Sequence, residues 1–160
     1  MQTFRCSVCG QLLFFENSLC LGCGSAIGYD PATRDLVVVD PAMHQYCINA
    51  AVARCNWLIP DDEPEALCAS CRLTSVRPSD DEPDALAAFA EAEAAKRRLL
   101  DQLFALGLPV GNDLTFEFLS SRDRQVVTGH EAGVITLDLS ESDNAHREFV
   151  KQQLGEQYRT

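Results

Sequence analysis

The 160-residue sequence has no cysteine after Cys71, although eight cysteines lie between Cys6 and Cys71. It also has no stretch that approaches the roughly 18 apolar residues of a membrane-spanning helix. Its start, MQTFRCSVCG, lacks the basic segment and apolar core of an export signal. These absences predict a protein with no membrane partner that resides in the cytoplasm. In that reducing compartment, closely paired cysteines are better interpreted as metal ligands than as disulfides.

Basic residues are scarce in the cysteine-containing part, where only Arg5 precedes residue 34. The formal net charge of the whole chain is −11 with neutral cysteines. If eight thiolates held two Zn²⁺ ions, four more negative charges would be added, giving about −15. Such a chain repels phosphate backbones, which zinc ribbons that bind nucleic acid contact through clustered Lys and Arg. We therefore expect no nucleic-acid partner.

The stretch CSVCGQLLFFENSLCLGCG contains two C-x-x-C-G pairs around an apolar segment. The two-residue gap lets both sulfurs of a pair face one ion, and Gly10 and Gly24 permit a positive φ where the backbone turns close to the metal. We predict a zinc ribbon over residues 1–28 with one structural zinc ion. Its expected ligands are Cys6, Cys9, Cys20 and Cys23. Iron in the same four-thiolate cage is the alternative that the residues alone do not separate.

Four cysteines remain in the segment 29–78, and we predict that they form a second structural zinc site. Its expected ligands are Cys47, Cys55, Cys68 and Cys71. The last two form a C-x-x-C pair, whereas the first two are separated by seven residues. His44 is an alternative ligand, because it lies three residues before the first of these cysteines. Trp57 is expected to cover the cluster and to donate its N–H to a carbonyl.

Residues 79–160 are expected to form a helix-strand-strand-helix arrangement. Helical start and stop signals and apolar spacing predict one long helix from Asp80 to Leu106. Period-two alternation predicts strands over residues 114–119 and 133–139, and a capping pattern predicts a second helix over residues 141–154. The predicted fold class is α+β: the zinc ribbon, the second four-cysteine module, a long helix, a small antiparallel sheet and a C-terminal helix.

The long helix carries the basic triplet Lys96-Arg97-Arg98. Glu91 and Glu93 lie within helical reach of these side chains. We therefore predict that the triplet forms a salt-bridged face with these glutamates and not a binding patch.

Four segments together resemble the bacterial zinc-dependent metallopeptidases that carry an N-terminal zinc ribbon. They are FRCSVCGQLLFFENSLCLGCG, CNWLIPDDEPEALCASCRL, EAAKRRLLDQL…LGLP and TGHEAGVITLDLSESD…LGEQYRT. In that family, the segment after the equivalents of Tyr158-Arg159-Thr160 forms the active-site helix with H-E-x-x-H, two metal-binding histidines around a general-base glutamate. This sequence contains no H-E-x-x-H, because Val134 stands where the second histidine after His130-Glu131 would be.

The resemblance implies that residues 79–160 are part of a truncated zincin-like domain. The chain is then expected to be the N-terminal region of such a protein, binding structural zinc without hydrolysing peptides, with no catalytic residue of its own. Its expected partner is a protein or peptide. One possibility is that the strand over residues 133–139 offers its edge to a peptide, and the alternative is an ordinary core strand. A different class of function is a free-standing zinc-ribbon adaptor that binds a protein partner.

Overall fold

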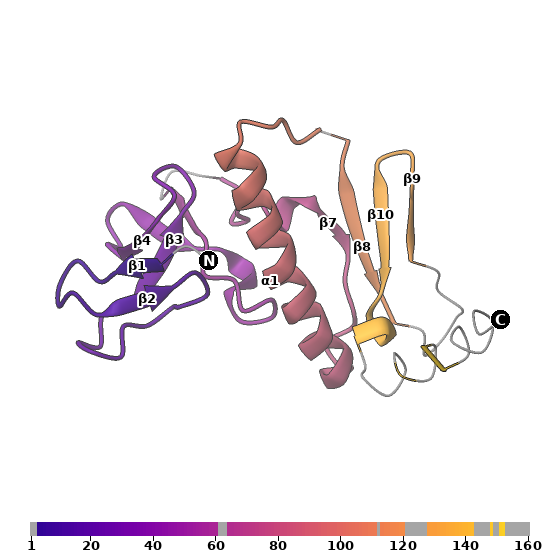
Figure 1. Cartoon of the computed structure of the whole chain (residues 1–160), viewed down its shortest axis with the longest axis horizontal. Helices are drawn as coiled ribbons and strands as arrows, with labels where there is room; N and C mark the ends of the chain where they lie inside the picture. Colours follow the sequence, from indigo (N-terminus) through magenta and orange to yellow (C-terminus); the bar gives the residue numbers. More distant parts are fainter. Residues whose placement is uncertain are drawn as a thin grey trace. The chain divides into compact units, whose positions relative to one another are not determined.

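The computed structural model describes residues 3–60, 64–111, 113–120, 128–142, 148, 151 and 152 (Figure 1). The chain divides into two compact units, one of Met1–Arg72 with Glu93–Val110 and one of Leu73–Ala92 with Gly111–Thr160. Helix α1, Pro83–Ala105, contributes residues to both units. The domain division predicted from the sequence stays a prediction, with its segments 1–28, 29–78 and 79–160.

The first unit contains three two-stranded antiparallel sheets. These sheets pair β1 (Thr3–Arg5) with β2 (Leu12–Phe14), β3 (Ile27–Asp30) with β4 (Asp35–Val38), and β5 (His44–Tyr46) with β6 (Leu58–Pro60). Two 3₁₀ turns, Ile48–Ala50 and Cys71–Leu73, lie beside the cysteines of the second module. In β1 and β2, only the central residues Phe4 and Leu13 are buried, and they pair directly across the sheet. Period-two burial therefore leaves the other face of this hairpin in solvent.

An aromatic cluster forms the core of the first unit. The Tyr29 ring lies 4.6 Å from the ring of Phe15, 5.3 Å from that of Trp57 and 6.3 Å from that of Phe4. Trp57 is fully buried and also contacts Phe104 of α1, at 6.4 Å between ring centroids. Its Nε1 has no hydrogen-bond partner among the described residues. The predicted bond from the indole to a carbonyl is therefore absent there.

The basic triplet of α1 lies differently from the prediction. Lys96 and Arg97 are 4% and 0% exposed, whereas Arg98 is on the surface. Lys96 pairs with Glu93 at 2.6 Å, as helical spacing predicts, but both side chains are buried. The predicted salt bridge is therefore confirmed for Lys96 with Glu93, whereas Arg97 and Arg98 pair with Glu16. The physical reason is that the partners of Arg97 come from distant segments of the chain.

Asp101 provides a further buried polar contact between α1 and the strands. Its carboxylate accepts hydrogen bonds from the Tyr29 hydroxyl and from the Nε of Arg34, the latter at 2.9 Å. Burial, followed by the hydrogen bond to Asp101, raises the pKa of Tyr29. The phenol therefore stays protonated as a donor, which fixes the angle of β3 against the last turns of the helix.

In the described part of the second unit, four strands form one sheet in the order β7-β8-β10-β9. Its strands are β7 (Thr74–Val76), β8 (Thr115–Leu119), β9 (Gly129–Glu131) and β10 (Val134–Asp138). The α+β class is confirmed, but this sheet is mixed: β8 runs parallel to both β7 and β10, and only β9 is antiparallel to β10. The reason is the tight turn at Ala132 and Gly133, with φ of 48° and 86°, which folds β10 back between β8 and β9 (Figure 1).

Strand β10 is hydrogen-bonded on both sides, by β8 and by β9. One of the two hypotheses gave the edge of residues 133–139 to a peptide, but β9 occupies that edge. The strand is internal to its sheet, in agreement with the alternative of an ordinary core strand. On β8, Phe118 is 1% exposed and packs edge-to-face on Phe89 of α1, with ring centroids 5.2 Å apart. This contact holds the sheet to the first half of the helix, as the alternation predicted.

The predicted C-terminal helix over residues 141–154 lies mostly outside the described residues. The described part contains a 3₁₀ turn, Leu139–Ser142, and helical conformation at residues 148, 151 and 152. Among the described residues, the helices lack the combination of length and apolar character that a membrane-spanning segment requires.

Candidate metal centres

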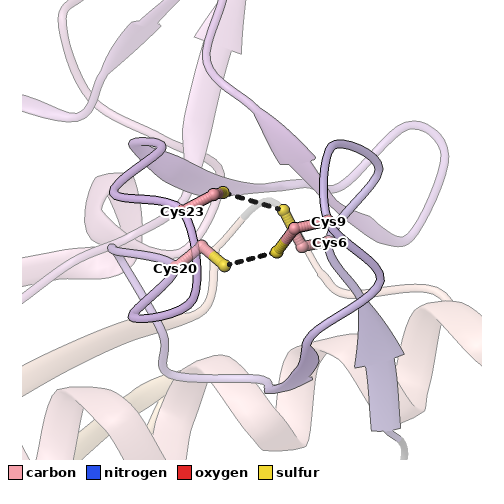
Figure 2. A group of neighbouring side chains, drawn as sticks. All are labelled: Cys6, Cys9, Cys20 and Cys23. Atoms are coloured by element: carbon pink, nitrogen blue, oxygen red, sulfur yellow. Dashed lines mark hydrogen bonds between the residues drawn. The ribbon is translucent and has the colours of Figure 1, made fainter.

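The four cysteines of the first module converge on one point. Figure 2 shows Cys6 and Cys9 on one turn and Cys20 and Cys23 on a second turn that faces it. The Sγ atoms of Cys6 and Cys23 lie 3.7 Å apart, and those of Cys9 and Cys20 lie 3.5 Å apart. All four sulfurs lie within 4.8 Å of one another. The structure thus brings together the four residues that the spacing selected.

The two turns have the same backbone construction, which explains why both sequences read C-x-x-C-G. The N–H of Gly10 donates to the carbonyl of Cys6, and the N–H of Gly24 donates to that of Cys20, both at 2.8 Å. The glycines have φ of 75° and 76°, so the predicted left-handed conformation is confirmed. A side chain at either position would be strained, because L-residues rarely adopt this backbone conformation.

The first centre is half exposed. Cys6 and Cys20 are 3% and 0% exposed, whereas Cys9 and Cys23 lie on the surface. The Cys23 sulfur lies 3.2 Å from the hydroxyl of Ser25. This side-chain hydrogen bond is the largest cause that lowers the pKa of Cys23, to about 6. Its thiolate is therefore available to a metal near neutral pH.

The second centre is formed by Cys47, Cys55, Cys68 and Cys71, whose sulfurs also lie within 4.8 Å of one another. The first of these precedes a 3₁₀ turn, the second precedes β6, and the C-x-x-C pair lies at the second 3₁₀ turn. All four are buried, with at most 3% exposure. His44, the alternative ligand, belongs to neither group of sulfurs.

Hydrogen bonds polarise the thiols of the second centre. The N–H of Cys68 donates to the sulfur of Cys47, and the N–H of Cys71 donates to the sulfur of Cys68, both at 3.4 Å. The hydrogen bond from Cys55 is the largest cause that lowers the pKa of Cys47. Conversely, hydrogen bonding to Cys47 raises the pKa of Cys55, Cys68 and Cys71. Zinc binds thiolates, so an ion that binds at this centre would displace the protons of the thiols.

Both groups have the geometry of a tetrahedral zinc site. With Zn–S bonds of about 2.3 Å, tetrahedral ligand sulfurs are about 3.8 Å apart. The sulfur pairs of the first centre, at 3.5 and 3.7 Å, and the Cys55–Cys68 pair, at 3.7 Å, are close to this separation. The eight cysteines are therefore positioned to hold two structural zinc ions. Four sulfurs at each centre match the number of ligands that a structural zinc ion takes.

Arg97 is a supporting residue that sequence reasoning did not find. Its guanidinium donates to the carbonyls of Ala53 and Arg54, both at 3.3 Å, directly before the ligand Cys55. Arg54 has φ of 47°, a conformation that a non-glycine residue keeps only when its surroundings hold it. Arg97 therefore fixes the backbone that presents one ligand of the second centre.

The hairpin of the first module is tied to the same region. Arg97 and Arg98 both reach the carboxylate of Glu16, at 3.5 and 2.6 Å. The buried side chain of Asn56 donates to the carbonyls of Phe15 and Asn17, at 2.7 and 3.1 Å. The residue after the ligand Cys55 therefore contacts the segment between the two turns of the first centre, and these bonds connect the backbones beside the two centres.

The sequence was also compared with known proteins. A family model described as a zinc-ribbon domain matches residues 3–82. A second, described as "Putative zinc-binding metallo-peptidase", matches residues 85–160. Three curated proteins, one from Mycobacterium bovis and two from strains of Mycobacterium tuberculosis, are each 51% identical over 168 residues, which cover 100% of this chain and 49% of theirs. Their names describe them as uncharacterized proteins. No solved structure matches.

The two cysteine centres and the ribbon turns define a zinc-ribbon protein. With both family matches, the assignment becomes specific: the chain belongs to the zinc-ribbon family whose model covers residues 3–82, and its residues 85–160 match the family described as "Putative zinc-binding metallo-peptidase". It spans about half the length of the curated relatives it matches.

Proposed function

We propose that this chain is the N-terminal region of a zinc metallopeptidase, that it binds structural zinc, and that it is not itself catalytic. The observation that carries this proposal is that each set of four converging sulfurs is complete. A catalytic zinc site keeps one position for water, whereas a four-thiolate site does not. The sequence also has no H-E-x-x-H to form a third, open site. Zinc supplies cross-links here, and the cysteines hold the ribbon and the second module in shape.

Zinc content and activity test this proposal directly. The purified chain should contain about two zinc ions by elemental analysis. Cys9→Ser should lower the content to about one and unfold the ribbon locally, because its few apolar residues do not offset chain entropy without the metal. Cys55→Ser is the matched variant of the second centre and should also leave about one ion. The zinc-loaded chain should cleave no peptide in a mixed peptide library; turnover that a chelator abolishes would contradict the proposal.

A second candidate function, a zinc-ribbon adaptor for a protein partner, is favoured by one observation. Large apolar side chains are exposed around the first centre, in the turns and on the outer face of β2. They are Val8, Leu12, Phe14, Leu19 and Leu21, with exposures from 42% to 88%. The two candidates are separated by the encoding reading frame beyond Thr160. An H-E-x-x-H soon after this residue supports the peptidase region, and a stop codon supports the adaptor.

We further propose a cytoplasmic location, a protein or peptide partner, and no nucleic-acid partner. A reducing compartment is consistent with eight cysteines that form no disulfide. The net charge of −11 disfavours binding of a polyanionic partner such as nucleic acid. Binding to an oligonucleotide at low salt, weakening steeply as salt is added, would contradict the last part of this proposal.

A further inference from the structure

The two centres have the same four sulfur ligands but differ in access to solvent. In the first centre Cys9 and Cys23 are exposed, whereas every cysteine of the second centre is at most 3% exposed. The turns of the first centre do not cover these sulfurs with their own side chains, because Val8 and Leu21 are themselves 65% and 88% exposed. A small solute therefore has a direct approach to two zinc thiolates of the first centre. It has none, within the described structure, to those of the second.

Each exposed cysteine of the first centre also has the sulfur of a buried cysteine beside its own sulfur. Cys9 lies 3.5 Å from Cys20, and Cys23 lies 3.7 Å from Cys6 (Figure 2). Both pairs connect one turn to the other, and both combine an exposed residue with a buried one. This arrangement places an attacking thiolate beside each site at which an oxidant can react.

We propose that the first centre is a modification site for peroxides, at which Cys9 and Cys23 are oxidised and the first zinc ion is lost while the second centre stays intact. This inference rests on the proposed structural role of zinc. It adds that oxidation removes one of the two structural zinc ions. The substrate class is hydrogen peroxide or a small organic hydroperoxide, since a small electrophile can approach the sulfurs of two exposed cysteines that are partly covered by their sulfur neighbours.

The chemistry balances as two successive thiol oxidations. The Cys9 thiolate attacks one peroxide oxygen, so that an S–O bond forms, the O–O bond breaks, and the released hydroxide takes a proton to become water. Sulfur loses two electrons and the peroxide gains them. The Cys20 thiolate then attacks the sulfenic sulfur, an S–S bond forms, and the second oxygen leaves as water after protonation. Cys23 and Cys6 repeat both steps with a second peroxide, and the two disulfides no longer hold the ion.

The test uses the whole zinc-loaded chain, hydrogen peroxide and a colorimetric zinc chelator. We expect about one equivalent of zinc to be released at least about tenfold faster than the other, because access to the thiolate sets the rate. Peptide mapping by mass spectrometry should then show the Cys9–Cys20 and Cys6–Cys23 disulfides. Reduction with a dithiol in the presence of zinc should restore the zinc ion of the first centre, so that the chain again holds about two ions.

Cys55→Ser is the control variant, since it removes the second centre and leaves every ligand of the first. It should still release its zinc at the fast rate. Release of both ions at one rate, release of none, or disulfides formed within a single C-x-x-C pair would overturn the inference. Failure of the proposed function is recognised separately, because the untreated chain would then contain fewer than about two zinc ions.

Discussion

Replacing Arg97 with methionine should destabilise the first unit and loosen the second metal centre. The Arg97 side chain is 0% exposed, and it donates to the carbonyls of Ala53 and Arg54 just before the ligand Cys55. Methionine fills much of the same volume and has no donor. The substitution therefore leaves two carbonyls without their charged partner and keeps most of the apolar packing.

The expected loss of stability depends on the groups that Arg97→Met leaves without a hydrogen-bond or ion-pair partner. A buried carbonyl that loses its hydrogen bond costs about 1–3 kcal/mol. Removing one partner of a fully buried ion pair costs about 3–5 kcal/mol. The upper value does not apply here, because Glu16 is 37% exposed and keeps its 2.6 Å contact with Arg98. We therefore expect Arg97→Met to lower the free energy of unfolding by about 2–4 kcal/mol.

Arg98→Met is the matched control, since it removes a neighbouring arginine that contacts the same carboxylate from the surface. Arg98 is 50% exposed, so its loss should cost at most about 1 kcal/mol. Arg97→Lys keeps the charge but replaces the planar fork by a single ammonium group, and it should show most of the loss.

The assay is urea unfolding at a fixed free zinc concentration, followed through the fluorescence of Trp57, the only tryptophan. Zinc loss to a chelator gives a second measurement, in which Arg97→Met should release the second ion faster than Arg98→Met does. Equal losses of stability in the two methionine variants, or a loss below about 1 kcal/mol for Arg97→Met, would refute the reasoning.

Two further predictions concern the core of the first unit. The pKa of Tyr29 is raised by burial and by its bond to Asp101, so its contribution to stability is complete below pH of about 10 and declines as the pH rises above that value. Tyr29→Phe should cost about 1 kcal/mol at pH 8 and should show a weaker alkaline decline in urea unfolding; an unchanged decline would show that another group titrates. A Cβ at Gly28 would overlap the side chain of Leu58, so Gly28→Ala should lower the free energy of unfolding by about 1–3 kcal/mol. Gly129→Ala is the control, because a Cβ there meets no atom within 4 Å. Thermal unfolding should show a change of at most about 0.5 kcal/mol for this control.

The metal centres were predictable from the sequence because their chemistry is mostly local. Two ligands three residues apart and a following glycine determine the turn that presents them, and this pattern occurs twice between Cys6 and Gly24. The second centre needed a weaker argument, since Cys47 and Cys55 are not closely spaced and were assigned as the remaining cysteines. The structure brings them together with Cys68 and Cys71 through the β5–β6 pair.

The supporting contacts were not predictable by the same reasoning. Helical spacing relates Lys96 to Glu93 but contains no information about a carbonyl 44 residues earlier in the chain, which is the partner of Arg97. The order of strands in the second unit is similarly non-local. Alternation identified β8 and β10, but their parallel pairing depends on β9, which lies between them in the sequence and outside β10 in the sheet.

The division of helix α1 between the two units has a consequence for how the protein can be cut. The zinc-ribbon family model ends at residue 82, before the helix begins. A fragment ending there would keep all eight cysteines but would lose Arg97, Asp101 and Phe104, whose partners are the backbone beside Cys55, the Tyr29 hydroxyl and the Trp57 ring. The segment matched by the zinc-ribbon family model, residues 3–82, is therefore shorter than the first compact unit, which also includes Glu93–Val110.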